Sequence, residues 1–311
     1  MKLDYAGLFN ALQPEGHLVL GALLVLGFDM LWARHRPANR HHVALAIGLL
    51  SLALAGWKAI AVGGAGPVFG GVLILDSLAT ATRVGVVSLA ALAVALLPSP
   101  ARLRHPAEFV AILLCATTGF TLMAAANQLL IVFLAVELAS LSLYVLAGFD
   151  KTRPDSAEAG LKYYLFGGMA AAFLLFGFSL LYGLTGSLSL PMISDQLSMQ
   201  GPSPLLLVAL GMVLVAFGFK AAAAPFHLWA PDVYQGAPAP AAALIASASK
   251  LAGLVVFTRL LWPGLGSAVG TIAHLPTSVG WAPIVALLAA ASLLVGNFGA
   301  LAQTNVRRLL A

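Results

Sequence analysis

The most constraining feature of this chain is a series of apolar stretches, each about 20 residues long, that follow one another along almost its whole length. A helix of that length rises roughly 30 Å, which is the thickness of the hydrocarbon core of a bilayer. We therefore expect an all-α, polytopic transmembrane helix bundle. Its nine expected helices run approximately over residues 17–33, 43–62, 77–98, 107–125, 128–148, 157–184, 204–230 with a break, 240–262 and 281–301.

The composition excludes several other classes of protein. Of 311 residues, 61% are hydrophobic and 9% are charged, whereas soluble chains carry roughly 25% charged residues. The one cysteine, Cys115, excludes a disulfide scaffold and a cysteine-ligated cluster carried by this chain. The sequence contains no phosphate-binding loop, dinucleotide fingerprint or paired metal ligands, so we expect no cofactor and no metal site in this chain.

The basic residues predict the orientation of the chain. The formal net charge is +5, and on a membrane protein such a surplus reflects the placement of loops rather than nucleic-acid binding, so no nucleic-acid partner is expected. Short loops rich in Lys and Arg stay in the cytoplasm, which predicts an amino terminus outside. The loops of the inner side carry Arg34, Arg36, Arg40, Arg102, Arg104, Lys151, Arg153, Arg307 and Arg308, and the opposite side holds Lys2.

Some charges lie near the ends of the expected helices. Lys58, Arg83 and Arg259 are within one or two turns of the outer ends, where a long side chain reaches the lipid headgroups. We expect them to do so. Asp29 and Asp76 also lie near helix ends, and their position favours an interfacial or packing role.

Three other charges, on Glu137, Lys220 and Lys250, lie close to the middle of their helices. A charge at the bilayer centre opposes insertion by about 2.5 to 3.5 kcal/mol. Three such charges therefore indicate a structural or functional role. One alternative is a buried ion pair that fixes the register of the helices. A third ionisable group at the same depth favours a proton or ion path instead. Lys162, near the cytoplasmic end of its helix, either reaches the headgroups or feeds this path.

A proline close to Lys220 predicts a break in the same helix. Pro225 removes a main-chain hydrogen bond and clashes with the carbonyl of Ala221, so the helix should open beside Lys220. Discontinuous helices mark ion sites in membrane transporters, although a simple structural kink is the alternative. His227 follows the break, and its imidazole either relays a proton or has a structural role.

Several motifs around these residues resemble a known family. Residues 225–240 read Pro-Phe-His-Leu-Trp-Ala-Pro-Asp-Val-Tyr-Gln-Gly-Ala-Pro-Ala-Pro, and residues 247–250 read Ser-Ala-Ser-Lys. Residues 136–141 read Val-Glu-Leu-Ala-Ser-Leu. Together they resemble the N subunits of bacterial NADH:quinone oxidoreductase, respiratory complex I. The resemblance covers essentially the whole chain and is strongest from residue 106 to residue 311.

The resemblance implies an antiporter-like fold of 14 helices with two inverted five-helix repeats, each containing a broken helix. Residues 1–106 would form helices one to three, and residues 107–262 the first repeat, helices four to eight, with the break in helix seven. Residues 263–311 would begin the second repeat with helix nine. Because the family continues beyond Ala311, we expect the chain to be truncated at its carboxyl terminus, with the rest of that repeat absent.

The resemblance also implies roles for the charged residues. Glu137 and Lys220 would form the charged pair of helices five and seven, and Lys250 would continue the path on helix eight. Lys162 and His227 would belong to the hydrophilic axis beside them.

The implied function is translocation of protons from cytoplasm to periplasm across the bacterial inner membrane, coupled to quinone reduction elsewhere in a complex that uses NADH, FMN, iron–sulfur clusters and quinone. Its partners would be the other membrane-arm subunits, the bilayer, protons and water. One alternative is a subunit of a multisubunit sodium/proton antiporter, although residues 233–236 favour the respiratory family. Another alternative is a truncated scaffold that does not pump.

Overall fold

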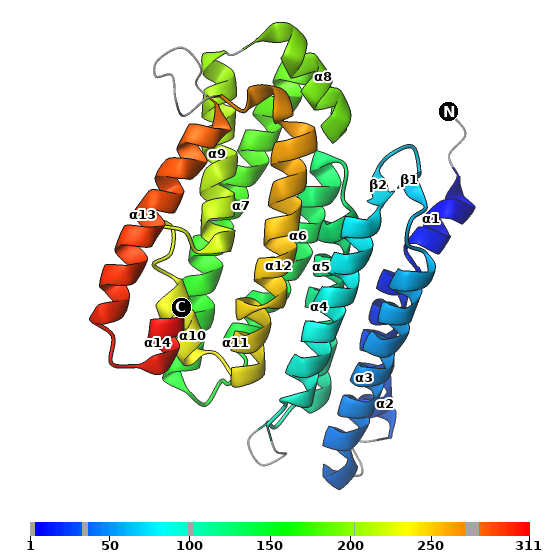
Figure 1. Ribbon diagram of the computed structural model, residues 1–311. Coiled ribbons are helices and arrows are strands. Elements are labelled where there is room, and N and C mark those ends of the chain that lie inside the picture. The colour runs from blue at the N-terminus through cyan, green and yellow to red at the C-terminus, as the bar shows by residue number, and fades with distance from the viewer. Residues whose placement is uncertain (1–3, 33–36, 99–102, 202, 271–279) are drawn as a thin grey trace.

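The computed structural model describes residues 4–32, 37–98, 103–201, 203–270 and 280–311, so Lys2, Arg34, Arg36 and Arg102 lie outside the described residues. Within those ranges, nine helical segments are long and apolar enough to cross a membrane, which confirms the expected polytopic bundle. Figure 1 shows them side by side. They are α2 (Gln13–Leu31), α3 (Pro37–Ala61), α4 (Ser77–Ala95), α5 (Pro106–Ala125), α6 (Leu129–Ala147), α7 (Pro154–Thr185), α9 (Pro204–Ala221), α11 (Ala239–Ala246) joined to α12 (Ala248–Arg259), and α13 (Trp281–Leu301).

Helix α5 is the most buried of these segments and packs against α2, α3, α4, α6 and α12. Its contact with α6 depends on Gly119, since a Cβ there would overlap the backbone of α6 at Ala135 and Ala139. Small residues at such a crossing let two helix backbones approach closely in a membrane. The contact fixes the position of α6, which carries Glu137.

Short elements cover the ends of the bundle. The helix α1 (Tyr5–Ala11) and the antiparallel hairpin of β1 (Gly66–Val68) and β2 (Leu73–Leu75) lie at one end, which we call the hairpin end (Figure 1). The connection from Gly186 to Pro204 contains α8 (Leu190–Gln200), which buries Leu190, Ile193 and Leu197 at helical spacing.

The predicted break is present after Lys220. Helix α9 ends at Ala221, Ala222 has a left-handed backbone (φ +59°), and the chain becomes helical again in α10 (Ala230–Gly236). A second interruption was not expected. The helix predicted over residues 240–262 is divided at Ser247, whose φ of −113° and ψ of −79° depart from helical values and whose hydroxyl donates to the carbonyl of Ala243. Helix α14 (Val306–Leu310) ends the chain beside α10.

The expectation that Arg83 and Arg259 reach the headgroups was wrong. The side chain of Arg83 is 1% exposed, and its guanidinium lies 2.9 Å from the carboxylate of Glu15, which is also buried. Arg259 is buried too and donates to the carboxylate of Asp76 at 2.5 Å and to the carbonyl of Ala124 at 2.9 Å. Both arginines therefore connect helices at the hairpin end, because a carboxylate from a distant part of the chain meets each of them.

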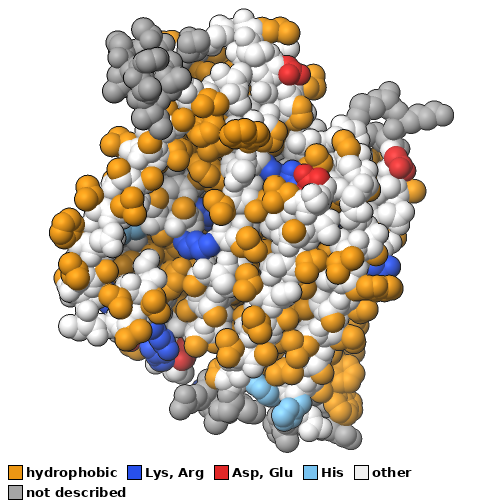
Figure 2. Space-filling view, in the orientation of Figure 1, with side chains coloured by type: hydrophobic (Ala, Val, Ile, Leu, Met, Phe, Trp, Pro, Cys, Tyr) orange, Lys and Arg blue, Asp and Glu red, His pale blue; other side chains and the backbone are white. Residues whose placement is uncertain are grey.

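The remaining charges near helix ends fit an interfacial position. Lys58 is partly exposed and its ammonium lies 5.0 Å from the ring centre of Trp57. Asp29 pairs with Arg40 at 2.5 Å. Asp76 caps the start of α4 through the main-chain N–H of Ala79. Figure 2 shows that hydrophobic side chains dominate the visible face and that charged side chains occur on it only in small groups, as lipid contact requires.

Candidate functional site

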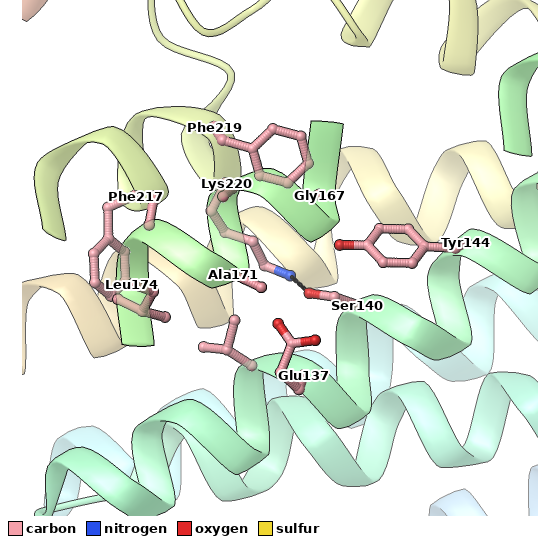
Figure 3. Close-up of a pocket in the computed structure, with 12 residues that line it drawn as sticks. Glu137, Ser140, Tyr144, Gly167, Ala171, Leu174, Phe217, Phe219 and Lys220 are labelled. Atoms are coloured by element: carbon pink, nitrogen blue, oxygen red, sulfur yellow. Dashed lines mark hydrogen bonds between the residues drawn. The ribbon is translucent and has the colours of Figure 1, made fainter. Parts of the chain in front are cut away.

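The site centres on Lys220, the second-last residue of α9. Its side chain is buried, and its ammonium donates to the hydroxyl of Ser140 on α6 at 3.2 Å. Figure 3 shows the ammonium facing the side of α6 that carries Glu137, Ser140 and Tyr144. These three residues are spaced i, i+3 and i+7, so they occupy one face of the helix. Sequence reasoning found Glu137 but missed Ser140 and Tyr144, although this spacing was visible.

Between α6, α7 and α9 lies a cavity of about 20 Å³, lined by Glu137, Ser140, Tyr144 and Lys220 among others. A cavity of this size has room for about one water molecule, and the four side chains named here supply its polar groups. Glu137 is half-buried, and no ion pair within 4 Å joins it to Lys220 in the described part of the chain. Gly167 of α7 leaves space for the ring of Tyr144, which a Cβ at this position would overlap. The carboxylate and the ammonium thus line one small cavity without direct contact, and most of the other residues that line it are apolar.

The break after α9 frees main-chain groups beside Lys220. In an intact helix its carbonyl would accept from the N–H four residues later, that of Ala224. Here the carbonyl of Lys220 accepts from the ammonium of Lys250 at 3.0 Å, and the N–H of Ala224 donates to the hydroxyl of Ser292 on α13 at 2.9 Å. The carbonyl of Phe219 accepts from the indole of Trp229 at 3.1 Å. The main-chain groups freed at the break therefore form hydrogen bonds with side chains of two other helices, α12 and α13.

Lys250 of α12 continues the line of polar groups. Its ammonium lies 4.9 Å from the ring centre of Trp229, a cation–π contact, in addition to the bond to the main chain of residue 220. Trp229 stacks on Tyr163 at 4.5 Å and is almost fully buried. A cavity of about 550 Å³ between α9, α12 and α13 is lined by both Lys250 and Lys220. Lys220 thus borders two cavities, one toward Glu137 and one toward Lys250.

Lys162 lies apart from these cavities, near the amino-terminal start of α7. Its ammonium pairs with Glu158 at 2.5 Å and with Asp232 of α10 at 2.6 Å. The other oxygen of Asp232 accepts from Arg308 of α14 at 2.8 Å. Burial raises the pKa of the Asp232 carboxyl, but the hydrogen bonds from Lys162 and Arg308 outweigh it and hold this pKa below its ordinary value. Sequence reasoning missed this network because Asp232 is 70 residues from Lys162 and 76 residues from Arg308 along the chain.

His227 lies in the segment between α9 and α10. It is half-buried, and its Nδ1 is buried without a hydrogen-bond partner among the described residues. It lines neither the cavity of Glu137 nor that of Lys250. The structure thus brings together Glu137, Lys220 and Lys250, while Lys162 and His227 lie outside their cavities. Within the described ranges, no group of three His, Cys, Asp or Glu side chains is placed to hold a metal ion.

The chain is similar to a known family of membrane proteins and to several curated proteins. Residues 126–311 match the family described as NADH:quinone oxidoreductase/Mrp antiporter, transmembrane. Among curated relatives, NADH-quinone oxidoreductase subunit N 2 of Acidobacterium capsulatum is 45% identical over 99% of this chain and 64% of its own length. A protein of the same name from Herpetosiphon aurantiacus is 36% identical over 97% of this chain. The chain thus spans about 64% of the length of these relatives.

Solved structures show the same fold. A chain of respiratory complex I from Thermus thermophilus with bound aureothin superposes with a TM-score of 0.76 at 34% identity, covering 96% of this chain and 60% of its own. A chain of the archaeal membrane-bound sulfane sulfur reductase superposes with a TM-score of 0.75 at 24% identity. The second likeness concerns the fold alone.

Proposed function

Because this chain belongs to the NADH:quinone oxidoreductase/Mrp antiporter transmembrane family, we propose that it is a membrane subunit of a proton-translocating NADH:quinone oxidoreductase. Its curated relatives named above carry the name subunit N of that complex. The observation that carries the proposal is the environment of Lys220, a buried lysine that is hydrogen-bonded to a neutral hydroxyl and borders two cavities. A lysine held by neutral partners can change its protonation state without breaking an ion pair.

The first transfer takes place between Glu137 and Lys220. One water molecule in the 20 Å³ cavity would connect the carboxylate and the ammonium, which are too far apart for direct contact. A nearby carboxylate stabilises the charged form of the lysine, and protonation of the carboxylate removes this stabilisation. A change of charge at Glu137 therefore shifts the proton affinity of Lys220. The hydroxyl of Ser140 holds the ammonium at the cavity in either state.

The second transfer leads from Lys220 to Lys250 through the larger cavity that both side chains line. Two ammonium groups so near each other disfavour simultaneous charging. A proton that arrives at Lys220 therefore promotes loss of the proton from Lys250. The ring of Trp229 and the carbonyl of residue 220 hold the amine of Lys250 in place.

Lys162 and His227 would act on the cytoplasmic side of this path. The network of Lys162 and Asp232 lies near the amino-terminal start of α7, where its side chains are partly exposed. Protons would be taken up there. His227 has an unpartnered ring nitrogen close to the helix break. Proton movement then runs from the cytoplasm toward the periplasm, with the amino terminus outside.

The complex would supply what this chain lacks. NADH, FMN, iron–sulfur clusters and quinone belong to other subunits, and quinone reduction there drives the charge changes along the mid-membrane path. The partners of this chain are the neighbouring membrane-arm subunits and the lipids of the bacterial inner membrane. We assign residues 107–262 to a five-helix repeat and α13 to the beginning of the next one.

The first test replaces Lys220 by Ala in the full-length subunit within the purified complex. Proton pumping coupled to NADH oxidation in reconstituted vesicles should fall by roughly tenfold or more, as for loss of a proton-transferring group, while the complex assembles normally. Glu137→Gln, which keeps the shape of the side chain, should also lower pumping. Normal pumping in Lys220→Ala would refute the assignment.

The antiporter alternative has its own test, since the family description includes Mrp antiporters. Transport by a complex I subunit stops when a quinone-site inhibitor such as piericidin blocks electron flow, whereas transport by a sodium/proton antiporter continues. Measuring proton uptake with and without the inhibitor, at fixed sodium concentration, distinguishes the two functions.

A further inference from the structure

A basic groove opens at the end of the bundle opposite the hairpin end. Its volume is about 940 Å³, and it lies between the end of α4, the start of α5, the end of α6, the start of α11 and α14. Four cationic side chains line it, from three separate segments of the chain: Arg104, Lys151, Arg153 and Arg307. Neither the proton path nor the network of Asp232 uses this groove.

The charges of the groove are incompletely neutralised. Two carboxylates line it, those of Glu108 and Asp150. Glu108 contacts His105 at 3.2 Å, and Asp150 accepts hydrogen bonds from Thr152. Arg153 is paired at 3.6 Å with Asp155, whose carboxylate lies outside the lining. Four cations against the carboxylates of Glu108, Asp150 and Asp155 leave a formal charge of +1. Arg104 and Lys151 are exposed and form no ion pair with any other residue that the structure describes.

The depth of the groove in the membrane is set by the helix ends around it. Spans α4 and α6 end, and α5 and α11 begin, within a few residues of its lining. Its cations therefore lie at the level of the lipid headgroups. We call its apolar part the floor; it consists of Ile112 and Val145, which lie within α5 and α6, and of Phe149, which directly follows α6. A free anion would use only the cationic rim and leave the apolar floor exposed to water.

We propose that this groove binds one anionic phospholipid, with the phosphate held between Arg104 and Lys151 and an acyl chain on the floor formed by Ile112, Val145 and Phe149. Basic pockets between transmembrane helices at the membrane surface recognise anionic headgroups in this way. The unpaired cations favour an anionic headgroup over a zwitterionic one, and the apolar floor favours a lipid over inorganic phosphate.

The test uses the full-length subunit in the purified, delipidated complex and native mass spectrometry with added phosphatidylglycerol as the probe. Arg104→Gln combined with Lys151→Gln should weaken retention by about fivefold for each cation removed. Val145→Trp, which fills the floor without changing charge, should also weaken retention. Lys58→Gln, at the opposite membrane face, is the matched control and should retain the lipid as the wild type does.

Phosphatidylcholine with the same acyl chains should bind the wild type more weakly and should not respond to the charge variants. Inorganic phosphate at millimolar concentration should not displace phosphatidylglycerol. The proposal is overturned if the double charge variant retains phosphatidylglycerol like the wild type, if phosphatidylcholine binds equally well, or if phosphate alone displaces the lipid.

Discussion

The buried charges at the hairpin end and those in the middle of the bundle are held by different kinds of partner. At the hairpin end Arg83 meets Glu15 at 2.9 Å and Arg259 meets Asp76 at 2.5 Å, each a direct ion pair. In the middle, Lys220 and Lys250 donate to a hydroxyl and to a main-chain carbonyl. A direct pair gives each charge an opposite charge as its partner. Neutral partners leave the protonation state of a lysine free to change, so the first region joins helices and the second suits proton transfer.

The largest effect should come from breaking a pair at the hairpin end. Replacing Arg83 by Met leaves the buried carboxylate of Glu15 without a cation, which destabilises a folded protein by about 3 to 5 kcal/mol. The midpoint of heat denaturation of the solubilised complex should fall clearly. The double variant with Glu15→Leu removes both charges and should regain most of the loss. A single variant as stable as the wild type would show that the pair does not join the helices.

Replacing the buried lysine in the middle of the bundle should, in contrast, not destabilise the protein. Lys220→Met removes a buried charge that has no ion-pair partner in the described chain, and replacing such a charge by an apolar side chain of similar length is neutral or stabilising by about 1 to 2 kcal/mol. The denaturation midpoint should stay or rise while pumping is lost. Destabilisation as large as that of Arg83→Met would mean that Lys220 has a structural role, and would remove the contrast between the regions.

A third region lies between these extremes. Asp232 pairs with Lys162 and Arg308, but all three side chains are partly exposed, and such pairs contribute about 1 kcal/mol or less. Asp232→Asn should therefore lower the denaturation midpoint slightly and slow proton uptake, measured as the initial rate of pumping. Asp155→Asn, which removes a longer and more exposed pair with Arg153, is the control and should change neither.

The smallest effect concerns pH. The pKa of Asp232 is lowered in the folded protein, because the bonds from Lys162 and Arg308 outweigh its burial. A lowered carboxyl pKa stabilises the fold fully above the unfolded value, near 3.8, and the contribution is lost as the pH falls through the folded value. The difference in denaturation midpoint between wild type and Asp232→Asn should thus be constant from about pH 5 to 8. A difference that varies within this window would indicate that another group titrates in the network.

The sequence was sufficient to predict the spans and the break after Lys220, since apolar length and a proline act locally. It was insufficient for Arg83 and Arg259, because their depth near helix ends is compatible both with headgroup contact and with a buried pair. The carboxylates that decide between these, Glu15 and Asp76, are 68 and 183 residues away along the chain. The division at Ser247 was missed for a different reason, since no proline or glycine marks it.

The candidate site was predicted in part. Mid-span position was enough to select Glu137, Lys220 and Lys250, because a charge in hydrocarbon is costly. The structure places them around two cavities that share Lys220, and their role in a proton path stays a prediction. The neutral partners Ser140 and Trp229 cannot be recognised in the same way, because neither side chain carries a charge. Their importance depends on which atoms they face, and this requires the packing of α6, α9 and α12.

The bond from Lys250 to the carbonyl of residue 220 has a consequence for how substitutions combine. Every amino acid supplies that carbonyl, so the amine of Lys250 keeps its anchor whatever side chain stands at position 220. A substitution at position 220 therefore removes the ammonium of Lys220 but not the main-chain acceptor of Lys250, and the backbone, which mutation does not remove, sets the spacing between the two positions.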